Sequence, residues 1–257
     1  MNANEIIKID WREHRSLILN YFVAANLAFL AIDILLAHSI NQFAHWAEWI
    51  PFCFSVIAPP FLILGREKKR SIVIGVISIS IGVIGALLHL ESQFFKDFTL
   101  KSLVYTAPFV APLAYGGLGL LVIANELFEA SETRWSYAVL FAACGGYFGN
   151  FILALCDHAQ NGFFHWSEWI PVVAGALGTG FLGAPMLLDA TWRYTRAALF
   201  VMGIGVIVGS LGFVLHLRAD IMAREFVFRA PLFAPLLFPN LSLLGAFALF
   251  DLQSKKA

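Results

Sequence analysis

The chain alternates between long apolar runs and short polar segments. Eight runs approach the length of about 20 residues that a helix needs to cross a hydrocarbon layer of roughly 30 Å. They lie at 17–36, 49–65, 71–90, 103–124, 137–155, 169–188, 197–217 and 230–250. Together they contain one formally charged side chain, Asp33, so nearly all charges lie between the runs. The pattern predicts an all-α polytopic membrane protein with eight transmembrane helices.

The composition agrees with a membrane environment. The 257 residues are 60% hydrophobic and 13% charged, whereas soluble domains average about 45–50% apolar and about 25% charged residues. Lys and Arg together number 17, as do Asp and Glu, which argues against a nucleic-acid partner. Three cysteines, an odd number, argue against a disulfide-stapled secreted fold. The lipid bilayer is therefore the expected partner.

The distribution of Lys and Arg predicts the orientation, because cytoplasmic loops carry the excess of positive charge. With the N-terminus inside, twelve of the 17 Lys and Arg residues fall on the cytoplasmic side. We expect a protein of the inner (plasma) membrane with both termini in the cytoplasm. Residues 1–16 then form a cytoplasmic leader without a cleavable signal, and 251–257 form a tail.

Two segments of the chain resemble each other. HSINQFAHWAEWIP at 38–51 and HAQNGFFHWSEWIP at 158–171 are identical at nine of fourteen positions, and weaker matches follow downstream. Such similarity predicts two tandem four-helix repeats, 17–124 and 137–250. Because each repeat has an even number of spans, both have the same orientation, which gives parallel 4+4 pseudo-symmetry.

The residues common to both repeats are rich in imidazole and carboxylate groups at the predicted outer ends of the spans. They are His38, His45, Glu48 and His89 in the first repeat, and His158, His165, Glu168 and His216 in the second. Such side chains are good ligands for Fe, Cu or Zn. Helical segments over 38–48 and 158–168, the first capped by Ser39, would align three of the four residues on one face. We therefore expect these eight residues to bind a transition metal.

Haem b is a more specific version of this prediction. His89 follows Gly82 and Gly85 on one helical face, a surface that allows close approach of another backbone or of a flat macrocycle. His216 follows glycines at the same spacing. His89 and His216 would then be the axial ligands.

Other polar groups lie near the same end of the predicted bundle. Asp33, Asp157 and Cys156 are expected to tune the site or to relay protons. Prolines at the start of two spans should leave backbone carbonyls without their helical donors close to the histidines. These prolines are Pro108, Pro112, Pro231 and Pro235.

The residues therefore predict metal or haem binding, with redox chemistry or metal handling as the function, although no catalytic residue is identified. Phosphate-binding loops and GxSxG or HExxH motifs are absent from the sequence. One alternative is a proton-coupled or metal-ion transporter built from parallel repeats. Another is a non-catalytic subunit that docks a membrane or periplasmic protein. In a third interpretation the repeated His-Trp-x-Glu-Trp segments are aromatic membrane anchors whose His and Glu merely cap helices or form hydrogen bonds with one another.

Overall fold

The computed structural model describes residues 11, 13–64, 67–189, 191–222 and 232–255, whose regular secondary structure is helical, with no strand among them. Most of the predicted leader, the end of the tail, and Pro231 with the start of the run 230–250 lie outside the described residues. The prediction of an all-helical protein is confirmed for the described part.

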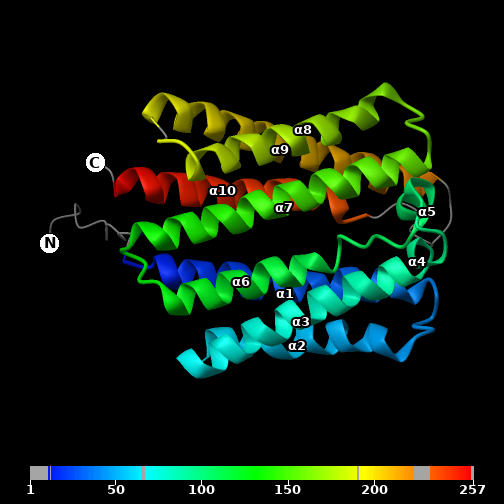
Figure 1. Cartoon of the computed structure of the whole chain (residues 1–257), viewed down its shortest axis with the longest axis horizontal. Helices are drawn as coiled ribbons and strands as arrows, with labels where there is room; N and C mark the ends of the chain where they lie inside the picture. The colour runs from blue at the N-terminus through cyan, green and yellow to red at the C-terminus, as the bar shows by residue number, and fades with distance from the viewer. Residues whose placement is uncertain (1–10, 12, 65–66, 190, 223–231, 256–257) are drawn as a thin grey trace, which may run out of the picture.

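The long helices run along one common direction and form an elongated bundle (Figure 1). They are α1 (Arg15–Ser39), α2 (Trp49–Ile63), α3 (Lys68–Glu91), α6 (Leu113–Leu127), α7 (Thr133–Gln160), α8 (Trp169–Gly183), α9 (Trp192–Met222) and α10 (Leu237–Ser254). The short elements are α4 (Phe94–Asp97), α5 (Leu100–Tyr105) and the 3-10 turns η1 (Trp46–Glu48), η2 (Trp166–Glu168), η3 (Ala184–Met186) and η4 (Ala234–Leu236). The start of α1 and the end of α10 lie at one end of the bundle, and α4 and α5 lie at the other.

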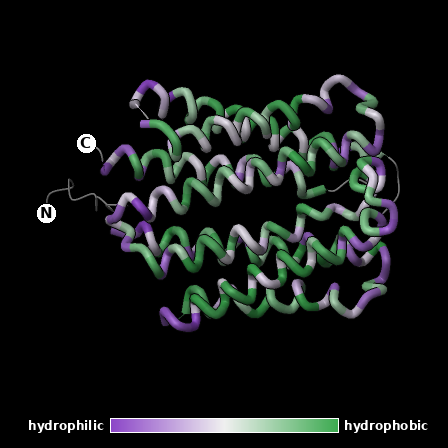
Figure 2. Tube along the Cα trace, viewed as in Figure 1, coloured by the Kyte–Doolittle hydropathy of each residue, from purple (hydrophilic) through white to green (hydrophobic). Residues whose placement is uncertain are grey.

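The surface of the bundle is apolar around its middle. Seven of the described helical segments are long and apolar enough to cross a membrane, and α6, with 15 residues, is shorter. Figure 2 shows hydrophobic residues along the middle of the helices and hydrophilic residues gathered toward both ends. Large apolar side chains such as Val56, Ile84 and Phe200 are exposed on the outside. These features are those of a multi-pass membrane protein whose helices contact lipid.

The predicted run 103–124 is not one continuous helix. The chain leaves α5 and passes through residues 106–112 without α-helical structure before α6 begins. Pro108 and Pro112 lie in this segment and supply no N–H group for a helical hydrogen bond, which explains the interruption. The helical prediction is therefore wrong at residues 106–112 of this run.

Glycines bring two helix pairs into close contact. A Cβ atom on Gly82 would lie 2.8 Å from the backbone of α6, and one on Gly85 would lie 2.8 Å from Pro112 Cβ. In the second half, a Cβ atom on Gly212 would lie 3.0 Å from Pro235 Cβ. The predicted close approach of another backbone is confirmed. Protein atoms, rather than open space, therefore cover the glycine faces that the haem interpretation uses.

Polar side chains connect helices within the apolar interior. Asn26 of α1 and Asn240 of α10 exchange amide hydrogen bonds of 3.3 and 2.5 Å. The Tyr147 hydroxyl of α7 lies 2.5 Å from the Ser242 hydroxyl of α10. In a bilayer, where apolar burial does little to drive helices together, such hydrogen bonds help to hold neighbouring helices in register.

Candidate functional site

The repeated segments 38–48 and 158–168 are not continuous helices, so this part of the prediction is wrong. Helix α1 ends at Ser39 and α7 ends at Gln160, and the chain then turns back toward the next helix. The Ser39 hydroxyl donates to the Leu36 carbonyl in the last turn of α1 instead of capping a new helix. Residues seven positions apart therefore do not align here as they would on one helical face.

The turn depends on a left-handed backbone at bulky residues. Gln42 and Phe43 have φ values of 59° and 52°, and Phe163 in the second segment has φ 51°. This conformation is unfavourable for large L side chains. Ring stacking accompanies it in both segments: Phe43 lies 4.1 Å from Trp49 between ring centroids, and Phe163 lies 3.9 Å from Trp169. The aromatic contacts offset the backbone cost and direct the chain into the next helix.

His45 and His165 stand at the N-cap positions of the two 3-10 turns. The Nδ1 atom of His45 accepts a hydrogen bond of 3.3 Å from the Ala47 backbone N–H. In the second turn, Glu168 Oε1 accepts from the His165 backbone N–H at 3.3 Å. A neutral His45 ring whose Nδ1 is an acceptor carries its proton on Nε2, and the predicted metal-binding role of His45 and His165 stays a prediction.

The capping role of His45 can be tested by substitution. His45→Ala should lower the free energy of unfolding by about 0.5–2 kcal/mol, because the Ala47 N–H loses its acceptor. His45→Asn should retain most of the stability, since asparagine is a favourable N-cap residue. Unfolding by SDS in mixed micelles compares the two variants, and equal losses would contradict the capping role.

Each repeated segment brings its first histidine to its glutamate. His38 Nδ1 lies 3.4 Å from Glu48 Oε2, and His158 Nδ1 lies 3.6 Å from Glu168 Oε2. Both separations exceed the usual N–H···O distance of about 2.7–3.2 Å. Both Oε2 atoms are buried and accept no hydrogen bond from the part of the chain that the structure describes. In each half, a buried carboxylate oxygen therefore faces an imidazole nitrogen without a close hydrogen bond.

His89 stands beside the first of these pairs. Its ring centroid lies 6.3 Å from that of His38, and its Nδ1 lies 2.9 Å from the Pro108 carbonyl oxygen. Because a carbonyl can only accept, this Nδ1 carries a proton, and Nε2 of the neutral ring keeps its lone pair. Pro112, four residues after Pro108, has no N–H to offer that carbonyl. The Pro108 carbonyl is not free, however, because it also accepts a hydrogen bond of 3.1 Å from the Ala111 N–H.

The second half has a comparable neighbour, because His216 is close enough to His158 to act on it electrostatically. Across the described residues, however, no group of three or more His, Cys, Asp or Glu side chains is placed to hold a metal ion. The structure assembles a histidine–glutamate pair with a nearby histidine rather than a finished set of ligands.

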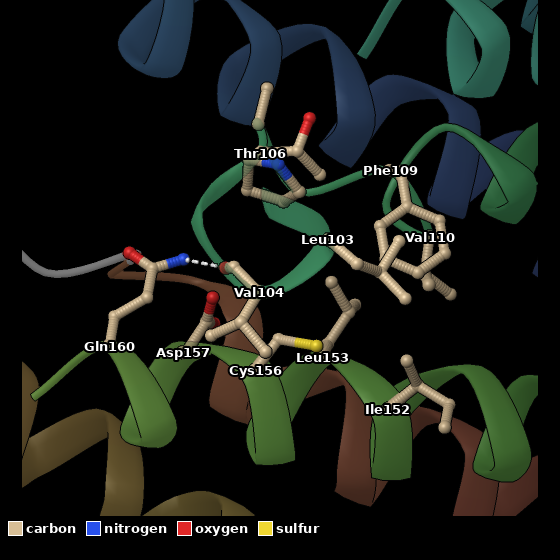
Figure 3. Close-up of a pocket in the computed structure, with 12 residues that line it drawn as sticks. Leu103, Val104, Thr106, Phe109, Val110, Ile152, Leu153, Cys156, Asp157 and Gln160 are labelled. Carbon is tan, nitrogen blue, oxygen red and sulfur yellow. Dashed lines mark hydrogen bonds between the residues drawn. The ribbon is translucent and has the colours of Figure 1, made fainter. Parts of the chain in front are cut away.

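The predicted tuning residues lie in other surroundings. Cys156 and Asp157 line a small pocket between α7 and residues 103–110 (Figure 3). Gln160 Nε2 donates to the Val104 carbonyl at 2.7 Å and ties the two walls together. Asp33 lies on α1, partly buried. The role of these three residues in tuning a metal stays a prediction.

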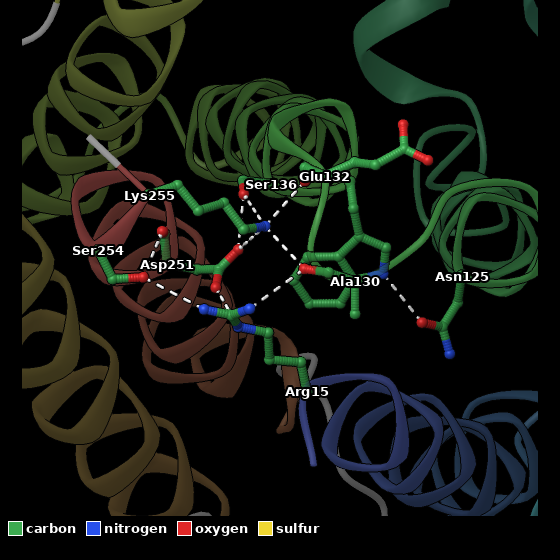
Figure 4. A network of polar contacts seen from close by, with 9 residues as sticks. Arg15, Asn125, Ala130, Glu132, Ser136, Asp251, Ser254 and Lys255 are labelled. Atoms are coloured by element: carbon green, nitrogen blue, oxygen red, sulfur yellow. Dashed lines mark hydrogen bonds and ion pairs between the residues drawn. The ribbon is translucent and has the colours of Figure 1, made fainter. Parts of the chain in front are cut away.

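Sequence reasoning missed a polar cluster at the end of the bundle where the termini lie (Figure 4). Asp251, which is 0% exposed, forms ion pairs with Arg15 and, at 2.7 Å, with Lys255. The Ser136 hydroxyl donates to the same carboxylate at 2.6 Å, and Lys255 Nζ donates to the Ala130 carbonyl at 2.8 Å. Burial lowers the pKa of Lys255, and the Asp251 carboxylate opposes this effect. The cluster joins α1, α7 and α10.

Comparisons with protein-family models, curated proteins and solved structures give no match for this chain. Within the chain, the segments 38–51 and 158–171 share nine residues and the local geometry described above.

Proposed function

We propose that the protein binds transition-metal ions at its histidine-rich end, with one ion in each half. The ligands are His38, Glu48 and His89 in the first half, and His158, Glu168 and His216 in the second. The main support for the proposal is the distance between the histidine Nδ1 atom and the glutamate Oε2 atom in each half. Two ligands of a tetrahedral ion with bonds of about 2.0–2.2 Å lie about 3.3–3.6 Å apart. The pairs, at 3.4 and 3.6 Å, fit this spacing better than that of a hydrogen bond.

The environment of His89 supports its role as a third ligand. A metal-bound histidine usually donates its other ring N–H to a carboxylate or a backbone carbonyl, which fixes the ring. The Pro108 carbonyl occupies that position at His89 Nδ1 and leaves Nε2 for the ion. His38, which faces Glu48 Oε2, has its ring centroid 6.3 Å from that of His89 and completes the set. We favour an ion over haem because Pro112 and Pro235 cover the glycine faces.

The proposal extends to the whole chain as two fused four-helix copies, 17–124 and 137–250, with the same orientation. The excess of Lys and Arg at the opposite end supports an inner-membrane protein whose histidine-rich end faces outward.

Imidazole and carboxylate ligands suit Zn, Fe or Cu. The activity is then metal handling, or redox chemistry if the ion is Fe or Cu. Transport and the docking of a periplasmic partner stay alternative predictions.

Zinc binding by matched double variants tests the proposal. The protein purified in detergent is dialysed against Zn²⁺, and bound metal per chain is measured by elemental analysis. The wild type should bind one ion in each half, and the variant with His38→Ala and His158→Ala should lose most of this metal. The variant with His45→Ala and His165→Ala should keep it, because these histidines belong to the same segments but cap the turns.

Two results would reject the proposal. In the first, the wild type takes up no more Zn²⁺, Cu²⁺ or Fe²⁺ than the His38/His158 variant. In the second, both double variants lose metal equally while circular dichroism shows that they are folded. That result would mean that His38 and His158 are not specifically the ligands. Glu48→Gln combined with Glu168→Gln keeps the side-chain shape without the charge, and it should weaken binding.

A further inference from the structure

The two repeated turns project tryptophans at the same end of the bundle as the histidines. Trp46 is 72% exposed and Trp166 is 80% exposed, although both are large apolar side chains. Each is the first residue of its 3-10 turn. We infer that these two turns are anchors that insert into the lipid headgroup layer and set the depth of the bundle. This inference does not depend on metal binding.

The backbone of the two repeated turns is held in a fixed conformation by side-chain contacts. Phe43 and Phe163 adopt a left-handed backbone that bulky residues rarely accept, and each is held by a stacked tryptophan, Trp49 or Trp169. The imidazole of His45 fixes the start of the first turn through its hydrogen bond to the backbone. A rigid turn loses little conformational entropy when its exposed aromatic side chain enters the membrane.

The anchors are continuous with the surface that contacts lipid. Turn η1 leads directly into α2, whose exposed side chains include Ile50 and Ile57, and η2 leads into α8, where Ile170 and Val173 are exposed. The tryptophans therefore stand where a lipid-facing helix reaches the membrane boundary, the depth at which their amphipathic rings are most favourable.

Charge identifies the kind of lipid contact. The segments 37–48 and 156–168 contain no Lys or Arg, so neither offers a cation to anionic headgroups. The contact is aromatic, and we expect it to form on zwitterionic lipid without help from anionic lipid. A protein partner on the same surface would instead require the tryptophans to project into water.

Fluorescence in vesicles tests the inference. The full chain is reconstituted in phosphatidylcholine that carries bromine on the acyl chain near the headgroup. The difference in emission between the wild type and the variant with Trp46→Phe and Trp166→Phe isolates the two tryptophans. Bromolipid should quench most of this difference signal, aqueous acrylamide should quench little of it, and added phosphatidylglycerol should change neither result.

The opposite pattern overturns the inference. If acrylamide quenches the difference signal and bromolipid leaves it unchanged, the turns project into water and are available to a protein partner. The single variants, Trp46→Phe and Trp166→Phe, provide a second measurement in which each should remove part of the bromolipid-sensitive signal. A signal that comes from one turn alone would contradict the paired anchor.

Discussion

Replacing Asp251 by alanine should lower the free energy of unfolding by about 3–5 kcal/mol, the range expected when one partner of a buried ion pair is removed. The carboxylate is fully buried, and the side chains of Arg15 and Lys255 that face it are 10% and 9% exposed. Without Asp251, Arg15 and Lys255 lose the buried carboxylate that both of them face. Titration with SDS in mixed micelles, followed through the fluorescence of buried Trp135, measures the loss.

Arg134 provides the matched control for this ion-pair variant. It pairs with Glu132 at 2.8 Å near the same end of the bundle, but its side chain is 75% exposed. Arg134→Ala should therefore change the free energy of unfolding by about 1 kcal/mol or less. If the Asp251 and Arg134 variants lose similar stability, burial does not explain the strength of the cluster.

Replacing Gly209 by alanine should destabilise the protein by about 1–3 kcal/mol, the usual result of adding a methyl group to a filled interior. The new Cβ atom would lie 2.5 Å from the Pro235 carbonyl oxygen and would also overlap Pro239. Because these contacts are with the backbone and a proline ring, no flexible side chain can move aside. Helix α10 would have to shift away from α9, which the same SDS titration detects.

Gly203→Ala is the matched control, because Gly203 lies on α9 like Gly209 but has no neighbour close to its Cβ position. A Cβ atom at this position would meet nothing within 4 Å. Gly203→Ala should leave stability unchanged or raise it by about 0.5–1 kcal/mol, because alanine loses less backbone entropy than glycine in a helix. Similar destabilisation of both variants would show that the close contact with α10 is not the cause.

The sequence was sufficient to predict the class of fold, for a physical reason. A bilayer requires long uncharged stretches, and these are visible without any knowledge of packing. Hydropathy does not separate a helix from a turn, however, and residues 106–112 are as apolar as their neighbours. Pro108 and Pro112 were the available signal for the interruption, and the Pro108 carbonyl does lie beside His89, although it also accepts from the Ala111 N–H.

The arrangement of the histidine-rich segments could be predicted only in part. The spacing of His38 and Glu48 suggested proximity on a helix, and the two side chains do meet, but across a turn. Nothing in the local sequence indicates that Phe43 takes a left-handed backbone, since its stacking partner Trp49 lies six residues away. Histidine is also not a usual N-cap residue, and a capping role for His45 was expected only under the membrane-anchor interpretation.

The cluster around Asp251 was missed because its members are far apart in the sequence. Arg15 and Ser136 reach the carboxylate from other helices, and only the spacing of Asp251 and Lys255, four residues apart after the last apolar run, carries a local signal.

The order in which the chain is synthesised gives this cluster a further consequence. Arg15 comes from the first helix, the Ala130 carbonyl from the connection between the two halves, and Asp251 from the last helix. The first helix is therefore made long before the carboxylate that neutralises its arginine. A nascent chain that stops short of Asp251 exposes an uncompensated charge at the membrane edge. Insertion of the final segment thus acts as the closing step of assembly.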